Sequence, residues 1–331
     1  MKKKNDVPRG KTGRIATQRE RGQKPARTIR SGTWRHDLLM NKSLYLLAIP
    51  VIAYFIIFYY VPMGGLAMAF ENFKPQRGIF DSEWVGFKHF IDFFTGPNFL
   101  RILRNTLVIS LLNLGIAFPL SITFALLLNE MNCLKVKKLV QTVSYMPYFI
   151  SIVVLCGLVT EFCSSQGAVT NLLVAVFGIP RENLLTNPDY FWAINLISDI
   201  WQNLGYSSII FVAAITSVNS DFHEAAALDG ANRLQRVWHI TIPAIMPTIV
   251  TMLILRCGTL LNVGFEKILL LYNSSIYEAA DVISSHVQRL GIAQGQYGYA
   301  TAVGLFNSVV GTVLLFLSNF ISKKYTDTSI V

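Results

Sequence analysis

Charged residues are scarce in this sequence. They make up 15% of its 331 residues, and hydrophobic residues make up 52%. Soluble domains carry about 25% charged residues. The mean hydropathy of +0.44 points the same way. So little charge excludes a chain built from soluble domains, and we expect an integral membrane protein.

Cysteine is scarce too, with four in the chain. Their spacing fits neither a metal site nor a disulfide framework. The five histidines show no HExxH or comparable spacing. We therefore predict no metal site.

Nucleotide-binding and catalytic patterns are missing from the sequence. Gly10-Lys11-Thr12 looks like the end of a phosphate-binding loop, but Asn5 stands where the first glycine is needed. No nucleophile–base constellation is present. We expect no cofactor bound by this chain, and a membrane-embedded enzyme acting on lipid or glycan is the weaker alternative.

The positive charge is concentrated at the N-terminus. The net charge is +10, and residues 1–42 hold 13 Lys and Arg against three acids. This segment has neither aromatic platforms nor a folded basic face, which argues against nucleic-acid binding. We interpret 1–42 as a basic, disordered cytoplasmic arm near anionic membrane lipid. A transmembrane domain over 43–331 follows it.

Six apolar runs are long enough to cross a bilayer, because a span needs about 20 residues. They lie at 44–62, 105–128, 140–161, 190–217, 247–271 and 301–321. With the N-terminus inside, the cytoplasmic segments carry 20 Lys and Arg and the external segments carry seven. This excess favours both termini in the cytoplasm. We expect an all-α, multi-pass membrane protein with six transmembrane helices.

One polar segment, 218–247, separates the fourth and fifth runs and is predicted to be cytoplasmic. Glu224–Leu228 are strong helix formers, and Gly230 allows a sharp turn. A second amphipathic piece should stop at Ile242-Pro243. The segment predicts a helix–turn–helix elbow. Composition alone also allows a loop that merely lies on lipid.

Polar residues inside two of the runs indicate a solute path. At about 100° per residue, each run gathers polar side chains on one helical face. These are Asn195, Asp199, Gln202, Asn203 and Tyr206, with Trp201 beside them, and Arg256, Thr259, Asn262 and Glu266. Amides, carboxylates and rings suit a hydroxyl-rich solute.

Arg256 needs a partner or a wet cavity, because an arginine at the centre of a span costs about 2.5 to 3.5 kcal/mol. A solute path would provide the cavity. The open alternative is that Arg256 pairs with Asp199 or Glu266 purely to hold the bundle together.

The elbow carries a specific motif. Its residues are Glu224-Ala225-Ala226, Asp229-Gly230-Ala231, Trp238, Ile240, Ile242-Pro243 and Pro247. This pattern resembles the EAA loop of ABC-importer permeases. Residues 84–87, 104–107, 126–130 and 141–147 resemble MalF-like, type I carbohydrate permeases, and 262–266 and 270–273 resemble the LplB-like branch. The resemblance covers most of the chain beyond the N-terminal arm.

The resemblance implies a permease subunit of an ATP-driven importer in the bacterial plasma (inner) membrane. Such permeases pair with a second homologous permease, two cytoplasmic ATPase subunits that bind ATP and magnesium, and an external solute-binding protein. The LplB-like branch includes permeases for polysaccharide-derived oligosaccharides. Oligosaccharide transport by alternating access is therefore implied, with a non-sugar solute on the same fold as the alternative.

The resemblance also implies that the elbow is a coupling helix that docks on an ATPase. The expected coupling residues are Glu224, Ala225, Ala226, Asp229, Gly230, Trp238, Ile242 and Pro243. Glu224 would contact the ATPase and Gly230 would form the bend. Val237-Trp238-His239 departs from the family pattern, in which paired aromatics or an arginine are common.

Overall fold

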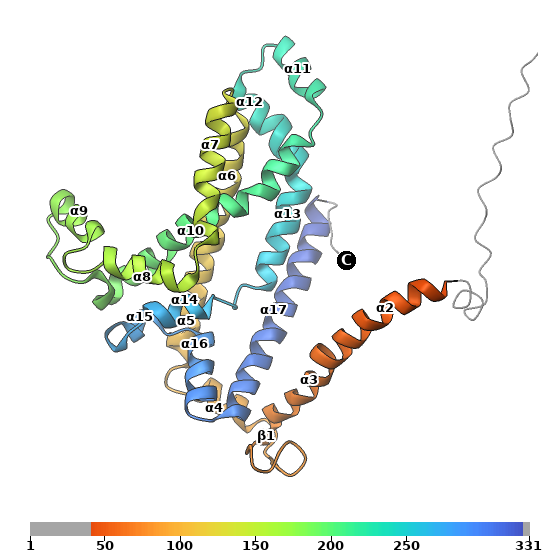
Figure 1. Ribbon diagram of the computed structural model, residues 1–331, viewed down its shortest axis with the longest axis vertical. Helices are drawn as coiled ribbons and strands as arrows, with labels where there is room; N and C mark the ends of the chain where they lie inside the picture. Colours follow the sequence, from red (N-terminus) through yellow and green to blue (C-terminus); the bar gives the residue numbers. More distant parts are fainter. Residues whose placement is uncertain (1–40, 327–331) are drawn as a thin grey trace, which may run out of the picture. The chain divides into compact units, whose positions relative to one another are not determined.

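The computed structural model describes residues 41–326. Its contacts divide the chain into two units, residues 1–62 and 63–331. The predicted basic arm, 1–42, lies outside the described residues apart from its last two, so its boundary with the transmembrane domain stays a prediction. The secondary structure is almost entirely helical (Figure 1).

The described part of the first unit is an apolar helix. α2 (Lys42–Phe55) passes through a π-turn, Ile56–Tyr60, into α3 (Val61–Met63). No residue of α2 or of this π-turn is buried. An apolar helix without buried side chains is typical of a segment placed in lipid.

The second unit contains five longer helical runs and several short helices. The runs are α5 (Phe99–Leu112) with α6 (Phe118–Asn129), α7 (Leu134–Tyr145) with α8 (Ile152–Phe162), α10 (Pro188–Thr216), α12 (Arg233–Arg236) with α13 (Ile242–Gly258), and α17 (Tyr297–Thr326). The short helices are α4 (Lys88–Thr95), α9 (Ala168–Phe177), α11 (Ser220–Leu228), α14 (Phe265–Leu271), α15 (Tyr277–Ala280) and α16 (Ile283–Gln288). Strands β1 (Glu71–Asn72) and β2 (Glu83–Trp84) form one antiparallel pair, with Glu71 opposite Trp84.

Four helices among the described residues are long and apolar enough to cross a membrane, and a fifth counts if α7 and α8 form one broken span. The four are Lys42–Phe70, Phe99–Asn129, Arg233–Gly258 and Tyr297–Lys324. α10 has 29 residues, but its middle is polar. The predicted all-α membrane fold is confirmed, whereas the count of six spans stays a prediction.

Two of the predicted spans are broken. The run 140–161 bends by 100° between α7 and α8, where Pro147 lies in a 3-10 turn. The run 247–271 ends its helix at Gly258, and α14 starts only at Phe265. Gly258 marks the close approach of α13 to α17, because a Cβ on Gly311 would lie 2.6 Å from the Gly258 carbonyl oxygen. Neither run is therefore one continuous helix.

Three prolines follow π-turns in the part of the chain that the structure describes. The residue before each proline donates its N–H five residues back: Val61 to Ile56, Phe118 to Asn113 and Ile242 to Val237. The wider turn makes room for the proline ring, which in an α-helix clashes with the carbonyl four residues earlier. The helix therefore continues through Pro243, and the predicted stop at Ile242-Pro243 is wrong.

Three clusters of buried side chains hold the second unit together. One joins α5, α8, α10, α14 and α15 around Cys156, Phe191 and Ile268. Another joins α4, α5, α16 and α17 around Phe93. A third joins α6, α10 and α13 around Phe211. α10 contributes to two of the three and is the central helix of this unit.

A buried carboxylate fastens the segment α15–α16 to α5. Asp281 is 0% exposed, and its two oxygens accept hydrogen bonds from the Arg289 guanidinium at 3.1 and 2.7 Å. Arg101 on α5 lies 3.6 Å from the same carboxylate. Asn105, also on α5, donates to the backbone oxygen of Asp281 at 3.0 Å. Charge-assisted bonds of this kind hold the two elements in one geometry.

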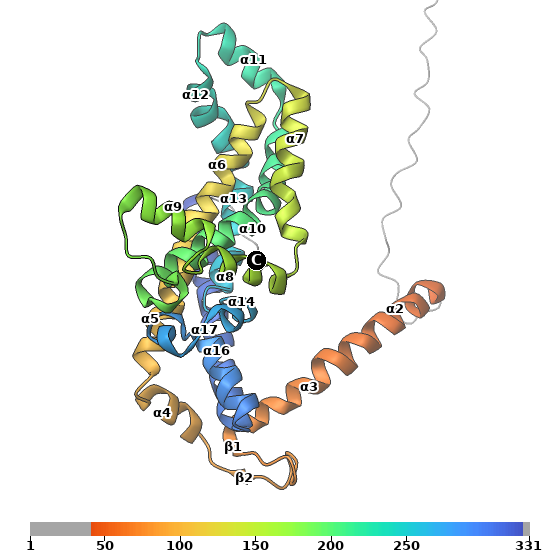
Figure 2. The same cartoon turned by 60° about the vertical axis from the view of Figure 1, so that its left-hand side comes forward.

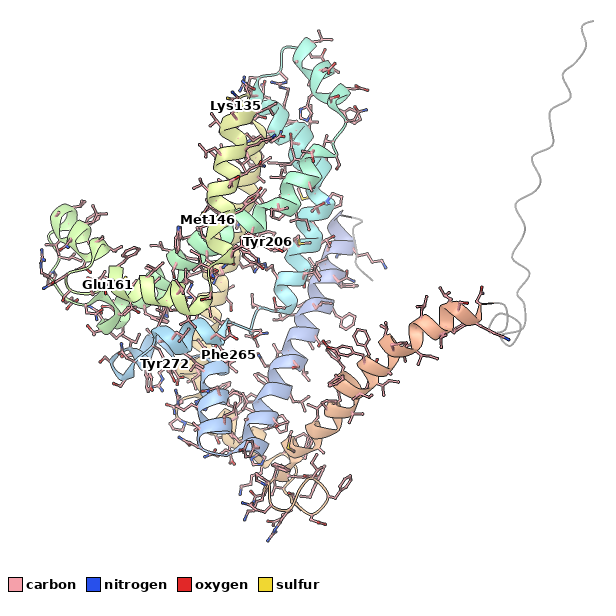
Figure 3. The ribbon with its side chains drawn as sticks, viewed as in Figure 1. Lys135, Met146, Glu161, Tyr206, Phe265 and Tyr272 are labelled. Atoms are coloured by element: carbon pink, nitrogen blue, oxygen red, sulfur yellow. The ribbon has the colours of Figure 1, made fainter. Side chains whose placement is uncertain are left out.

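The elbow and the strand pair lie at opposite ends of the second unit. α11 and α12 occupy one end, and α4 with β1 and β2 the other, in both views (Figures 1 and 2). Lys135, at the start of α7, lies at the end that carries the elbow (Figure 3). Residues 129–139, which connect the second and third apolar runs and are cytoplasmic in the predicted orientation, therefore share one end with segment 218–247.

Candidate functional site

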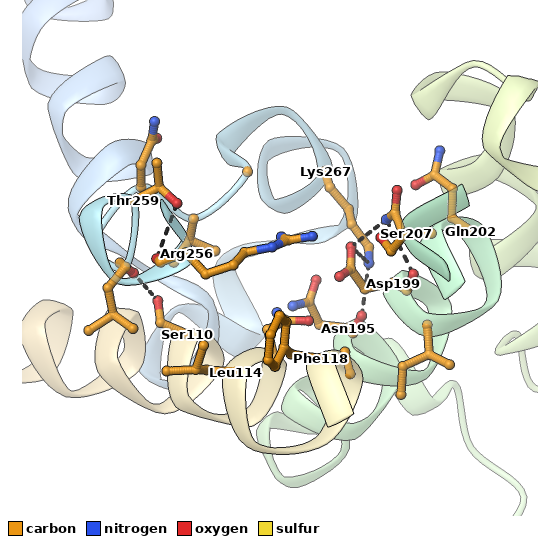
Figure 4. A pocket seen from close by; sticks show the side chains of 18 of the residues that line it. Ser110, Leu114, Phe118, Asn195, Asp199, Gln202, Ser207, Arg256, Thr259 and Lys267 are labelled. Carbon is orange, nitrogen blue, oxygen red and sulfur yellow. Dashed lines mark hydrogen bonds and ion pairs between the residues drawn. The ribbon is translucent and has the colours of Figure 1, made fainter. Parts of the chain in front are cut away.

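A polar cavity of about 620 Å³ lies among α5, α6, α10 and the break between α13 and α14 (Figure 4). Small-molecule sites have volumes of about 300 to 1,000 Å³, so a solute of that size fits. The polar side chains of the lining are Ser110, Asn113, Ser121, Asn195, Asp199, Gln202, Asn203, Ser207, Arg256, Thr259, Asn262, Glu266 and Lys267.

Eight of the ten residues predicted for the solute path line this cavity. They are Asn195, Asp199, Gln202, Asn203, Arg256, Thr259, Asn262 and Glu266. Trp201 is exposed at 45% and lies outside the lining. Tyr206 instead stacks on Tyr148, with 3.7 Å between ring centroids. The part of all ten in solute passage stays a prediction.

The residues of the fifth run reach the cavity without sharing a helical face. The helix ends at Gly258, so Thr259 and Asn262 lie in the following turn and Glu266 lies in α14. The predicted continuous face is therefore wrong. Only the gathering of these side chains around one space agrees with the prediction.

Side chains from other elements satisfy the backbone of this turn. Ser110 on α5 donates to the carbonyl oxygen of Leu260, and Ser284 on α16 donates to that of Val263 at 3.2 Å. Non-helical backbone at membrane depth is tolerated where protein buries it or a cavity adjoins it. The break between α13 and α14 meets both conditions.

Lys267, a residue that the polar spacing did not predict for the site, pairs with Asp199. Its Nζ lies 3.6 Å from Asp199 Oδ1 and donates to the backbone oxygen of Asn195 at 2.8 Å. Asn203 donates to the same carboxylate oxygen at 3.1 Å. The signal that could have revealed Lys267 is a lone lysine directly before the apolar residues 268–271, because an ionisable group at membrane depth requires a partner.

Arg256 takes part in none of the ion pairs found among residues 41–326. The alternative of a structural pair with Asp199 is not realised, since Lys267 holds that carboxylate. The side chain of Arg256 instead extends from α13 into the cavity (Figure 4).

Two amide oxygens of the lining have no hydrogen-bond partner among the described residues. They are Asn113 Oδ1 and Asn195 Oδ1, and Asn195 is 4% exposed. An unpaired buried acceptor costs about 1 to 3 kcal/mol. These two oxygens can therefore accept hydrogen bonds from a solute that carries hydroxyl groups.

The predicted elbow is present at the other candidate site. After α11, Gly230 adopts a φ of +82°, in the left-handed region that glycine enters without strain. The N–H of Ala231 then donates to the carbonyl of Ala226 at 2.9 Å and closes the helix end. α12 begins with a reciprocal capping box between Asn232 and Gln235.

The side chains of the elbow are largely free of contacts with the rest of the chain. Glu224, Ala225, Asp229, Gly230 and Pro243 are exposed, whereas Ala226 and Ile242 are half-buried. Trp238 is 61% exposed. The surface is open to a partner protein, and its coupling role stays a prediction.

The side chains that could bind a metal ion are scattered in the part of the chain that the structure describes. Among residues 41–326, no three or more His, Cys, Asp or Glu side chains gather as a metal site requires. The four cysteines are free, with Cys156 and Cys163 buried, Cys257 partly buried and Cys133 exposed.

Comparison with known proteins identifies relatives over most of the chain. A family profile described as binding-protein-dependent transport system inner membrane component matches residues 121–327. The polygalacturonan/rhamnogalacturonan transport system permease protein YteP of Bacillus subtilis (strain 168) is 44% identical over 293 residues, which cover 88% of this chain and 91% of the relative. Protein LplB of the same strain is 43% identical over 88% of this chain and 92% of its own.

Solved structures agree in fold. A chain in the crystal structure of a bacterial ABC transporter involved in the import of the acidic polysaccharide alginate is 43% identical, with a TM-score of 0.82, over 88% of this chain and 99% of that one. A second crystal structure shows the alginate transporter in complex with an alginate pentasaccharide-bound periplasmic protein. A chain of that structure is 42% identical, with a TM-score of 0.82, over 90% of this chain and 99% of its own length. This chain therefore belongs to the family of binding-protein-dependent transport system inner membrane components and is a membrane permease of the ABC-importer type.

Proposed function

We propose that this permease carries oligosaccharides across the bacterial plasma membrane by alternating access. The names of YteP and of the alginate transporter, which concern polysaccharide-derived solutes, support this solute class. The cavity supports it independently, because its lining is rich in amide and hydroxyl groups that can bond sugar hydroxyls.

The working importer contains a second homologous permease, two cytoplasmic ATPase subunits and an external solute-binding protein. ATP and magnesium bind to the ATPase subunits. The periplasmic protein bound in one alginate transporter structure supports the last of these partners. The excess of Lys and Arg in 1–42, 129–139 and the elbow supports cytoplasmic termini.

The exposed elbow α11–α12 is the observation that carries the coupling role. Glu224 faces outward on α11, and the left-handed Gly230 sets the angle between α11 and α12. ATP closes the ATPase dimer, which moves the docked elbows together. α12 continues into α13, which carries Arg256, so this movement reaches the cavity wall and exposes it alternately to the two sides.

A Gly230→Pro variant tests this coupling. Proline fixes a negative φ and removes the N–H that Gly230 donates to Ala227 at 3.1 Å. Gly178→Pro is the matched control, because Gly178 has a φ of +66° and donates to Val174 at 3.0 Å. We expect the reconstituted Gly230→Pro complex to lose solute-stimulated ATPase activity, while the affinity of the solute-binding protein for sugar stays unchanged.

The control decides between coupling and folding. Gly178→Pro should retain solute-stimulated ATPase activity. Wild-type stimulation in the Gly230→Pro complex would overturn the assignment of the elbow, and so would an equal loss in both variants.

A further inference from the structure

Only two of the four charged side chains that line the cavity in the described part of the chain form an ion pair with each other. Four ionisable side chains line it: Asp199, Lys267, Arg256 and Glu266. Asp199 and Lys267 lie 3.6 Å apart and neutralise each other. Arg256 and Glu266 belong to no ion pair found among the described residues. The cavity thus offers one cation and one anion to a solute.

Arg256 is the cation, and its chemistry favours a carboxylate. Its guanidinium extends into the cavity (Figure 4). The group stays protonated and presents five donors but no acceptor. Its planar fork bonds both oxygens of one carboxylate, which gives the strongest class of protein hydrogen bond.

Asn195 adds a second requirement on the same solute. The residue is 4% exposed, and its Oδ1 has no partner among the described residues. An amide oxygen only accepts hydrogen bonds, so it requires a donor such as a hydroxyl group. A solute that meets both Arg256 and Asn195 must carry a carboxylate and free hydroxyls.

Glu266 restricts how such a solute can lie. It lines the cavity at the start of α14. A solute carboxylate placed beside it would be repelled, whereas sugar hydroxyls can donate to it. The carboxylate is therefore directed to Arg256 and away from α14.

From these contacts we infer that the cavity selects uronate-bearing oligosaccharides, with Arg256 binding the carboxylate and Asn195 accepting a hydroxyl. The inference rests on the proposed function and narrows its substrate class. The acidic nature of alginate, named for one structural relative, agrees with it.

The test measures binding of two matched sugars to the whole importer complex in lipid nanodiscs, without the solute-binding protein. The probes are trigalacturonate and its fully methyl-esterified, neutral form, and saturation-transfer NMR titration gives the dissociation constants. We expect Arg256→Gln to weaken trigalacturonate binding about 10- to 100-fold, the effect of losing charge-assisted hydrogen bonds. The weaker binding of the ester should stay unchanged.

Two further variants sharpen the result. Arg256→Lys keeps the charge but loses the fork, so it should restore part of the affinity for trigalacturonate. Arg181→Gln removes the same charge from an exposed position outside the cavity lining. This variant should leave the affinity for both probes unchanged.

Equal weakening of both probes by Arg256→Gln, or no weakening of either, overturns the inference and leaves oligosaccharide transport standing. Absence of binding by both probes in the wild type also overturns it. Coupling of solute to ATP hydrolysis is judged separately, by the Gly230→Pro experiment.

Discussion

Lys267 and Asp199 form an ion pair whose two members differ in burial. The side chain of Lys267 is 8% exposed and that of Asp199 is 31% exposed. Asp199 also accepts a hydrogen bond from Asn203, whereas the ammonium of Lys267 has the Asn195 carbonyl as its other acceptor. The lysine therefore depends more on the pair than the aspartate does.

This asymmetry predicts unequal effects of removing each partner. Asp199→Asn leaves a charge buried without a counter-charge and should lower the free energy of unfolding by about 2 to 4 kcal/mol. Lys267→Met leaves a carboxylate that Asn203 and the cavity still solvate, so about 1 kcal/mol is expected. Thermal unfolding of the purified complex, followed by intrinsic fluorescence, ranks the two variants.

The double variant provides the control. Asp199→Asn with Lys267→Met removes both charges and should be more stable than Asp199→Asn alone. If Lys267→Met is the more damaging single change, the role given to burial is wrong.

Residue positions in the cavity were predictable where the helix is regular. Asn195, Asp199, Gln202 and Asn203 follow helical spacing on α10, and all four line the cavity. Tyr206 shares the spacing but stacks on Tyr148. The spacing of polar residues along a helix assigns them to one broad face of that helix. Which side chains at the border of this face reach the cavity depends on the neighbouring elements.

At the scale of elements, the segment α15–α16 depends on a charged centre around Asp281. His286 on α16 contacts this centre, because its Nδ1 lies 3.3 Å from Arg289, and its Nε2 lies 3.2 Å from the Tyr299 hydroxyl. Burial lowers the pKa of His286 below 6.5, Asp281 opposes this shift, and Arg289 and Arg101 add to it. The folded protein therefore favours the neutral imidazole.

A loss of stability on acidification follows from this lowered pKa. In the unfolded chain the histidine takes up a proton near pH 6.5, whereas in the folded chain it does so only at lower pH. The stabilisation is thus fully present above about pH 6.5 and is lost as the pH falls toward the folded pKa. Thermal unfolding midpoints measured between about pH 7.5 and 5.5 should fall, and less steeply in His286→Gln.

His239→Gln is the control for this pH series. His239 is exposed in the π-turn Val237–Thr241, so this variant should keep the wild-type slope. A wild-type slope in His286→Gln would show that other groups cause the acid sensitivity.

The existence of the helices was predictable from apolar runs, and Pro147 signals the bend between α7 and α8, but the break after Gly258 was not predictable. Hydropathy is averaged over a window of about 20 residues. Such an average is the same for one straight span and for a bent pair of helices such as α7 and α8. The break after Gly258 depends on its close contact with Gly311 and on the bond from Ser110 to Leu260. Both partners lie more than 50 residues away along the chain, so no local pattern reports them.

At the scale of the whole molecule, the proposed orientation makes a prediction about Cys133. This exposed cysteine lies in the segment that shares its end with the elbow. A membrane-impermeant maleimide should label it in inside-out vesicles and leave it unlabelled in right-side-out vesicles. Cys133→Ala should abolish this labelling, because Cys156 and Cys163 are buried and Cys257 is partly buried.

A cysteine at the opposite end gives the converse measurement. Phe80, which lies between β1 and β2, is 101% exposed. Phe80→Cys in a Cys133→Ala background should be labelled only in right-side-out vesicles. Labelling of Cys133 from the outside would reverse the proposed orientation.

The π-turns before Pro62, Pro119 and Pro243 have a consequence for how the helices are wound. A π-turn holds one residue more than an α-turn, and one residue corresponds to about 100° of rotation about the helix axis. The turn Val237–Thr241 lies between the elbow and the helix that carries Arg256. That single extra residue sets the rotation of the elbow about the helix axis relative to the cavity. Deleting one residue from this turn would rotate the elbow by about a quarter of a revolution. The residues of both sites would remain unchanged.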